Sequence, residues 1–329
     1  FISIAWSYDK NIGIYYFFAT GNMVMLLLVV LNIKWDEKNV DTIKYLMVIS
    51  AVVFSTLMIL RRDLYHQVGI RYTLNIRGTE IDPNNISGLL IPEAIISLDF
   101  INKKKYKIIQ IICFIIITIG ITLSGSRGGI LAFIISILAY IFYYIKYKHS
   151  ISGNKIIINF KIKNIIYIII IIYSISILFS NLENIIGTQL LERIKIENII
   201  NNSDEGSGRT ELWDRAISLY KNNIILGIGL GSFGAITNQG VHNQYLRILI
   251  ETGPISLIIF VSIILSFIIK LRDQKNAFGI SIMLGMIVII FFLDAFQKKY
   301  MWNPMILSMI EINKVKNKNI KPESVKKMI

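Results

Sequence analysis

Residues 108–123 read IIQIICFIIITIGITL and contain no charged side chain. A second apolar run extends from Ile165 to Phe179. Such runs approach the ~20 residues that a helix needs to cross the hydrocarbon core of a bilayer, where a helix satisfies its own backbone hydrogen bonds. Of the 329 residues, 54% are hydrophobic and 17% are charged. A water-soluble fold does not need so large a share of hydrophobic residues in such long runs. We therefore predict an all-α fold, a polytopic bundle of transmembrane helices.

The segments between the predicted spans alternate in lysine content. Hydropathy places nine spans, at residues 13–33, 42–60, 85–100, 107–124, 128–147, 164–180, 254–271, 277–297 and 301–312. The lysine-rich connections are 34–44, 103–107, 146–163, 270–275 and 314–327. The positive-inside rule places these connections in the cytoplasm. The other segments then face outward, namely the N-terminal stub, 61–84, 124–129, 181–253 and 294–300.

This topology divides the chain into four parts. Residues 1–180 form N-terminal transmembrane helices, and residues 181–253 form a large extracytoplasmic loop that contains amphipathic helices. Residues 254–312 form C-terminal transmembrane helices, and 313–329 form a basic cytoplasmic tail. Because the sequence begins at Phe1 without a methionine, we expect the natural start of the protein to lie upstream.

Arginine and lysine distribute differently in this topology. Twenty of the 25 lysines fall on the cytoplasmic side, whereas nine of the ten arginines face outward. The outward arginines are Arg61, Arg62, Arg71, Arg77, Arg127, Arg193, Arg209, Arg215 and Arg247. The planar guanidinium binds phosphate or carboxylate in bidentate fashion, so these residues predict an outward site for an anion. The alternative is that several of them, Arg61 and Arg62 above all, anchor the protein at lipid headgroups.

The hexapeptide Ser124–Gly129 (SGSRGG) interrupts two apolar runs almost without a loop and holds Arg127 at the membrane boundary. Its glycines permit close backbone approach, and the N-terminus of the helix that follows favours an anion. We predict either an anion site or a simple helical-hairpin turn.

The stretch Arg209–Tyr220 has apolar residues at helical spacing and predicts an amphipathic helix that lies on the membrane or on the spans. Arg209 stands in its first turn, where the helix dipole disfavours a cation, which suggests that Arg209 has another role. The glycine-rich stretch Gly227–Gly234 contains G-x-G-x-x-G. It lacks the strand–helix context of a dinucleotide site, so we interpret it as a flexible loop that brings backbone close to a ligand.

The stretch Val241–Pro254 predicts a helix that begins near His242 and Asn243 and is closed by a Gly-Pro step. An imidazole at the mouth of a membrane segment can act as a general base, because its unperturbed pKa lies near neutrality. The alternative is a capping or packing histidine.

Other classes of site find little support. The three histidines, His66, His149 and His242, are dispersed, and no acidic cluster has metal-ligand spacing, so we predict no metal and no other cofactor. The lone Cys113 allows no intramolecular disulfide. The net charge of +14 is scattered between apolar runs, which does not indicate nucleic-acid binding. Glu93, a carboxylate within a predicted span, is either part of a site or part of a structural pair.

The chain contains five short motifs whose order, and whose placement relative to the predicted spans, match those of a known protein family. They are Ser124-Gly-Ser-Arg127-Gly-Gly, Gly208-Arg209-Thr-Glu-Leu-Trp213, Gly227-Ile-Gly-Leu-Gly-Ser-Phe, His242-Asn-Gln-Tyr-Leu before Glu251-Thr-Gly253, and Arg77-Gly-Thr before Asp82-Pro-Asn. From about residue 70 to its end, the chain resembles the superfamily of O-antigen ligases and Wzy-type O-antigen polymerases. Members usually have more spans than nine, which agrees with a start upstream of Phe1.

The resemblance implies a GT-C-like bundle in the bacterial cytoplasmic membrane and a metal-independent glycosyltransferase whose active site is extracytoplasmic. The donor would be an undecaprenyl-diphosphate-linked glycan and the acceptor a hydroxyl of a glycan, lipid or protein. Arg127 and Arg209 would hold the donor diphosphate, and His242 would orient or deprotonate the acceptor. Further substrate contacts would come from Arg77, Asn243 and Tyr245. A flippase and a chain-length regulator are the expected protein partners.

The resemblance leaves polymerase and ligase open. Ser256 stands where the ligase pattern has Gly, Thr or Tyr, which slightly favours a polymerase. Two other classes compete with an enzyme. The first is an anion permease, although paired repeats are absent from the sequence. The second is a non-catalytic component of a glycan-export complex.

Overall fold

The computed structural model describes residues 1–61, 65–68, 71–76, 79–151 and 209–319. Its elements in chain order are η1 (Ile2–Trp6), α1 (Lys10–Asn32), α2 (Glu37–Leu60), β1 (Tyr65–Val68), β2 (Arg71–Ile76), β3 (Thr79–Ile81), α3 (Pro83–Asn102), α4 (Lys107–Leu123), α5 (Arg127–Ile151), α10 (Arg209–Tyr220), α11 (Ser232–Thr237), α12 (Gln244–Asp273), α13 (Ala277–Ile289) and α14 (Lys299–Asn319). The predicted helical bundle is confirmed. The span at 164–180, Arg77 and the first part of the large loop, residues 181–208, lie outside the described residues.

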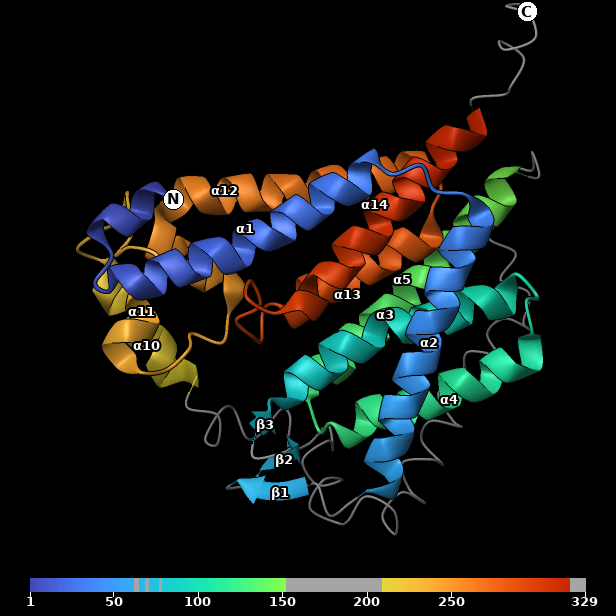
Figure 1. The fold of residues 1–329 in the computed structure, drawn as a ribbon, viewed down its shortest axis with the longest axis horizontal. Coiled ribbons are helices and arrows are strands. Elements are labelled where there is room, and N and C mark those ends of the chain that lie inside the picture. The colour runs from blue at the N-terminus through green and yellow to red at the C-terminus, as the bar shows by residue number, and fades with distance from the viewer. Residues whose placement is uncertain (62–64, 69–70, 77–78, 152–208, 320–329) are drawn as a thin grey trace, which may run out of the picture.

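In Figure 1, α1 and α14 end near the start of α2 at the upper right, and α3 begins at the opposite side of the bundle. At one end, the Lys44 ammonium contacts Glu311, and the Asn313 side chain donates to the carbonyl of Leu31. These contacts join the lysine-rich connections. At the other end, the Asn84 side chain donates to the carbonyl of Phe292. At each end, residues in or next to two connections that are predicted to share a side therefore lie together in space.

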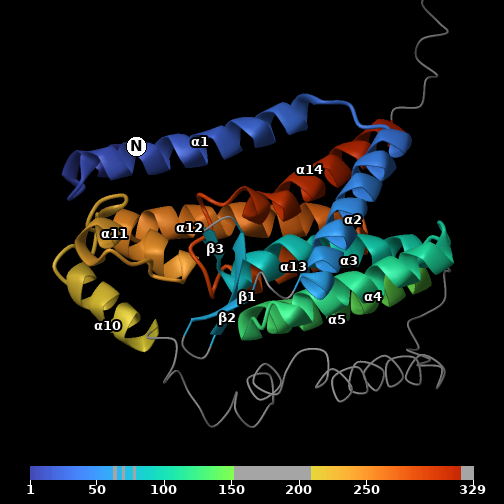
Figure 2. The same ribbon diagram turned by 60° about the horizontal axis from the view of Figure 1, so that its bottom comes forward.

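Four described helices are long and apolar enough to cross a membrane: Lys10–Asn32, Glu37–Leu60, Arg127–Lys148 and Gln244–Asp273. Large apolar side chains are exposed along α1, α4 and α12, as on Ile108 and Ile258. Lipid is the medium in which such surfaces are stable. Helix α1 lies at the edge of the bundle and stands apart from α2 to α5 in Figure 2. The other predicted spans in the described part of the chain correspond to α3, α4, α13 and α14.

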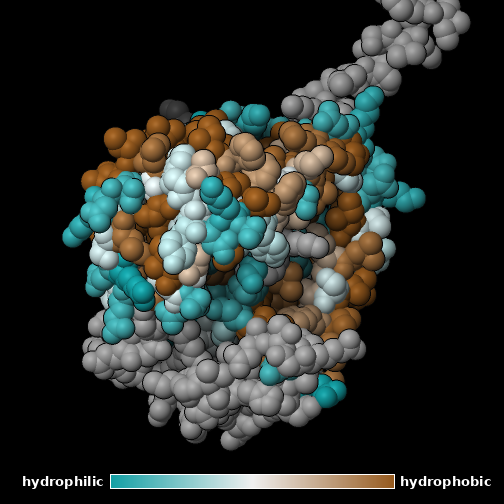
Figure 3. Space-filling model, turned by 60° about the vertical axis from the view of Figure 1, so that its left-hand side comes forward, coloured by the Kyte–Doolittle hydropathy of each residue, from teal (hydrophilic) through white to brown (hydrophobic). Residues whose placement is uncertain are grey.

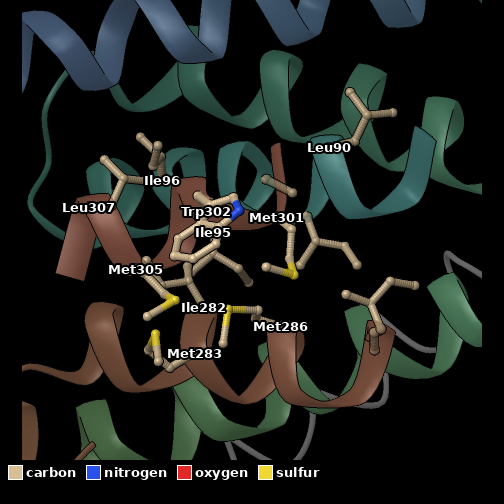
Figure 4. Packing of buried hydrophobic residues seen from close by; sticks show 14 of the residues in the cluster. Leu90, Ile95, Ile96, Ile282, Met283, Met286, Met301, Trp302, Met305 and Leu307 are labelled. Atoms are coloured by element: carbon tan, nitrogen blue, oxygen red, sulfur yellow. The ribbon is translucent and has the colours of Figure 1, made fainter. Parts of the chain in front are cut away.

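Helices α3 and α13 form the centre of the bundle. Leu90, Ile95 and Ile96 on α3 are fully buried, as are Ile282 and Met283 on α13. Figure 4 shows these side chains packed with methionines and Trp302 of α14. Unbranched methionine side chains fill irregular gaps, which suits the meeting point of three helices.

Two features differ from the sequence prediction. Residues Tyr65–Ile81 contain a three-stranded antiparallel sheet of order β1-β2-β3, which we did not predict. The pairing places Leu74 opposite both Tyr65 and Ile81, and Leu74 is buried. In addition, α13 ends at Ile289, not at residue 297. The apolar sequence continues, but the Gln244 side chain accepts hydrogen bonds from the Ala295 and Phe296 amides at 2.7 and 3.0 Å and holds residues 290–298 as a loop.

Helix α12 is broken at the predicted Gly-Pro step. Gly253 has φ 82°, and Pro254 has no N–H to donate to the carbonyl of Ile250. The glycine-rich loop replaces the lost bonds, because the Ile228 amide donates to the Ile250 carbonyl at 2.8 Å and the Gly229 amide donates to the Glu251 carbonyl at 3.0 Å. The first part of this loop therefore binds protein backbone, and the approach of the loop to a ligand stays a prediction.

We expect Gly253→Ala to lower the melting temperature of the purified protein. The conformation of Gly253, φ 82° and ψ 173°, is almost exclusive to glycine and costs alanine roughly 1–3 kcal/mol, and a Cβ at Gly253 would lie 2.2 Å from the Ile225 carbonyl oxygen. Gly21→Ala on α1 is the matched control, because its Cβ meets nothing within 4 Å. Thermal unfolding in detergent measures both variants, and equal melting temperatures would contradict the close approach.

Candidate functional site

A cleft of about 500 Å³ opens at the end where residues 79–85, 233–247 and 293–298 meet. Its walls are Ile12, Tyr16, Asp82, Asn85, Phe233, Gly234, Asn238, Gln239, Gly240, Val241, His242, Arg247, Leu293, Asp294, Gln297 and Lys298. Figure 3 views the molecule from this end, where hydrophilic residues occupy the middle of the surface and hydrophobic residues border it. The cleft is therefore a polar recess at one end of an apolar bundle.

His242 lies in the cleft wall immediately before α12. Its φ of 54° is left-handed, a conformation that few non-glycine residues adopt. Two neighbours hold it there: the His242 amide donates to Asp294 Oδ2 at 3.1 Å, and the Trp213 indole donates to the preceding carbonyl, that of Val241, at 3.0 Å. Strained backbone held by its surroundings is a feature of functional sites.

The side chains of Asp294 and His242 both lie near Gly240. A Cβ at Gly240 would lie 2.2 Å from Asp294 Oδ2 and 3.9 Å from His242 Cε1, so only glycine fits between the two side chains. Asp294 Oδ1 is buried and has no hydrogen-bond partner among the described residues. Because an unsatisfied buried acceptor is costly, this oxygen can accept a hydrogen bond from a ligand hydroxyl.

Arg247 lies one helical turn after His242 and is almost fully buried. Its Nε donates to Glu251 Oε2 at 3.3 Å, and its Nη1 donates to Gln297 Oε1 at 3.2 Å. Its guanidinium carbon is 4.5 Å from the centre of the Tyr16 ring, in cation–π range. The arginine is thus fixed on three sides and gives the cleft a positive wall.

Arg127 and Arg209 flank the loop that forms the other wall. The Arg209 Nη2 donates to the Phe292 carbonyl at 3.4 Å, and its guanidinium carbon lies 5.8 Å from the centre of the Phe292 ring. Gly128, next to Arg127, touches the same ring, since a Cβ there would lie 2.5 Å from Phe292 Cδ2. Arg127 Nε is buried without a hydrogen-bond partner in the described part of the chain. Arg209 and the residue after Arg127 thus both contact Phe292, two positions before Asp294.

The Ser124–Gly129 turn is held by polar contacts to α3. The Ser126 hydroxyl donates to Asn84 Oδ1 and accepts from the Gly129 amide, which caps α5. Asp82 caps α3 by accepting from the Asn84 amide at 2.7 Å, and Asp82 also lines the cleft. The predicted hairpin turn is present, and it also presents Arg127.

None of the four predicted substrate contacts that the structure describes, Arg127, Arg209, Asn243 and Tyr245, is among the residues that line the cleft. Asn243 is buried and caps α12, because its Oδ1 accepts from the Leu246 amide at 3.1 Å. The Tyr245 hydroxyl donates to the Ile287 carbonyl at 2.9 Å, and its ring packs against Phe260. Both side chains are thus committed to the fold, and Arg77 lies outside the described residues. Glu93 is buried in α3, away from the cleft, and its Oε2 lacks a partner among the residues described.

Helix α10 packs against Phe233 and Val241, two of the residues that line the cleft. Its predicted apolar stripe packs with Phe233, Val241 and Ile250 in a small second core, and Trp213 also packs edge-on against Phe291. The helix therefore lies on α11 and α12. No group of three or more potential metal ligands occurs within residues 1–61, 65–68, 71–76, 79–151 and 209–319.

Asp294 and Arg247 were not predicted as catalytic or substrate-binding residues. Arg247 stood among the outward arginines, and its position five residues after His242 was the only available signal. Asp294 lies in the predicted span 277–297, whereas α13 ends at Ile289. An acidic residue within an apolar run is a signal of a functional site, and this signal could have identified Asp294.

Residues 112–261 match the family described as O-antigen ligase. The match includes Arg127, Arg209 and His242, whereas Asp294 lies beyond it. No curated protein matches the chain.

Proposed function

The chain belongs to the superfamily of O-antigen ligases and Wzy-type polymerases, and on that premise we propose that it transfers a glycan from undecaprenyl diphosphate to an acceptor hydroxyl at the outer face of the membrane. The coarser part of this description, a membrane enzyme of surface polysaccharide biosynthesis, follows from the family. The observation that supports the finer part is a polar cleft that holds His242 and Asp294, next to the loop residue Phe292 that Arg209 contacts.

In the proposed reaction, the acceptor oxygen attacks the anomeric carbon of the donor. A new C–O bond forms while the bond from that carbon to the diphosphate oxygen breaks, and the electron pair leaves with the diphosphate. The acceptor proton passes to the imidazole of His242, which later releases it to water. Arg127 and Arg209 stabilise the charge that develops on the diphosphate, an electrostatic contribution that is often the largest in catalysis.

The product pattern distinguishes the two forms of this activity. Purified protein in nanodiscs is incubated with a lipid-linked repeat unit alone and then with a separate acceptor. A ladder of chain lengths from the repeat alone indicates a polymerase, whereas one discrete adduct that needs the added acceptor indicates a ligase. If neither product forms, and the donor is instead transported across proteoliposomes, the proposal is wrong.

We expect Arg127→Lys to lower transfer by about 10²- to 10³-fold, the range seen when an enzyme loses one donor to a developing oxyanion. Lysine keeps the charge but loses the planar fork and the Nε donor, which is buried and free of protein partners in the described structure. Arg215→Lys is the matched control, because Arg215 is exposed on α10, whereas the Arg127 Nε is buried. Initial rates with radiolabelled donor measure both, and an unchanged rate for Arg127→Lys would remove Arg127 from the diphosphate site.

A further inference from the structure

The turn between α10 and the glycine-rich loop presents three consecutive apolar side chains, Ile224, Ile225 and Leu226, with exposed fractions of 58%, 72% and 58%. This turn, the apolar tip, belongs to the segment that the topology places outside the membrane. All three are more than half exposed, so in water they would forfeit much of the stabilisation that burial gives to large aliphatic side chains.

The apolar tip is a defined structure. The Tyr220 hydroxyl donates to the Ile224 carbonyl at 2.6 Å, and the Gly227 amide donates to the Asn223 carbonyl at 2.8 Å. The Ile225 carbonyl packs on Gly253, where even one methyl group would not fit. The side chains of the tip are therefore presented outward by a fixed backbone.

The position of the apolar tip on α12 identifies the medium that covers it. Gly253, which the tip contacts, is the kink at which the apolar half of α12 begins. Directly beyond it, Ile255, Ile258 and Ile259 are also more than half exposed, on a helix long and apolar enough to span a membrane. The tip thus adjoins a surface that faces lipid.

The flanks of the apolar tip have the composition of a membrane interface. The Trp6 indole donates to the Gly227 carbonyl at 3.1 Å, and Trp6 is partly exposed beside the tip. Tyr220 and the exposed Lys221 precede it in the chain. Trp and Tyr gather at the headgroup level of bilayers, and lysine reaches from there toward water.

We propose that Ile224, Ile225 and Leu226 insert into the lipid leaflet on the cleft side of the membrane and anchor the loop there. Ile228 and Gly229, which follow the tip, are hydrogen-bonded to α12. The anchor therefore fixes the height of α12 and of the cleft relative to the lipid headgroups. This inference does not depend on the proposed reaction, because the cleft end and the lipid-facing surface of α12 suffice for it.

The test uses the chain with its single cysteine removed, Cys113→Ala, and one new cysteine labelled with the fluorophore NBD in nanodiscs. The labelled positions are Ile225→Cys in the tip, Ser218→Cys on the exposed surface of α10 as the aqueous control, and Ile258→Cys as the lipid control. We expect phosphatidylcholine with a doxyl group at acyl carbon 5 to quench position 225 several-fold more than position 218, and iodide to show the reverse order.

Either of two results would overturn the proposal. Quenching of position 225 by iodide as strong as at position 218 would place the tip in water. Protection of position 225 from both quenchers would mean that a protein, such as a second copy of the chain, covers it. Ile224→Cys and Leu226→Cys repeat the measurement, so that a local distortion by one label does not decide the result. Position 258 must remain lipid-quenched in the same preparation, which confirms that the labelled protein is folded in the bilayer.

Discussion

His242→Ala should lower glycan transfer by roughly 10²- to 10⁴-fold, the usual contribution of a positioned general acid–base group. His242 is the histidine in the cleft wall, its imidazole is the type of side chain that most often acts as a general acid or base, and its backbone is fixed by Asp294 and by the Trp213 contact to Val241. The measurement is the initial rate of transfer in nanodiscs at saturating donor, with protein amount and melting temperature recorded for each variant.

The left-handed conformation at His242 requires a second variant. Alanine at φ 54° is itself strained, so His242→Ala changes both the ring and the backbone. His242→Asn removes the imidazole but retains a residue that tolerates the left-handed region. We expect the same loss of activity from both variants. If His242→Asn transferred glycan at the normal rate, His242 would serve only to shape the chain.

The sequence was sufficient for the helical bundle because hydropathy and lysine content act over whole helices. The Gly253-Pro254 break and the Ser124–Gly129 turn were also predictable, because glycine and proline act locally on the backbone. The loop 290–298 was not predictable, since the side chain that holds it, Gln244, lies about fifty residues earlier in the chain. Long-range hydrogen bonds of one side chain leave no periodic signal.

The same contrast between local motifs and long-range contacts applies to the candidate site. His242, Arg127 and Arg209 stand in recognisable motifs, and the structure brings all three to the two sides of the loop that holds Phe292 and Asp294. Asn243 was predicted as a substrate contact because it follows the histidine, yet a side chain at that position is better used to cap α12. A motif identifies residues that matter but does not separate those that bind substrate from those that hold the fold.

At the opposite end of the bundle, the charged residues form a buried network. Lys44 on α2 has 1% of its surface exposed and contacts Glu311 of α14 at 2.5 Å and Asp99 of α3 at 3.8 Å. Lys103 and Lys314 complete the network, at 2.6 Å from Asp99 and 3.7 Å from Glu311. Burial lowers the pKa of Lys103, but the Asp99 carboxylate more than offsets this, so the pKa is raised above its ordinary value.

We expect Glu311→Leu to destabilise the protein by about 3–5 kcal/mol, the range for breaking a buried ion pair from one side. The change leaves Lys44 almost fully buried beside Lys314, with Asp99 as the remaining carboxylate near Lys44. Asp273→Asn is the matched control: the Arg272–Asp273 pair is 3.6 Å apart but more than half exposed, and exposed pairs contribute roughly 0–1 kcal/mol. Reversible unfolding in mixed micelles measures the free energy of unfolding of each variant.

The double variant Lys44→Met with Glu311→Leu separates the effect of the unpaired charge on stability from the effect of altered packing. Replacing both members of a buried pair by apolar side chains of similar size is often neutral, because neither charge is left without its partner. We therefore expect the double variant to regain most of the stability that Glu311→Leu loses. If the double variant were as unstable as the sum of its single changes, Lys44 and Glu311 would act independently, and the network would not be what joins α2 to α14 at this end of the bundle.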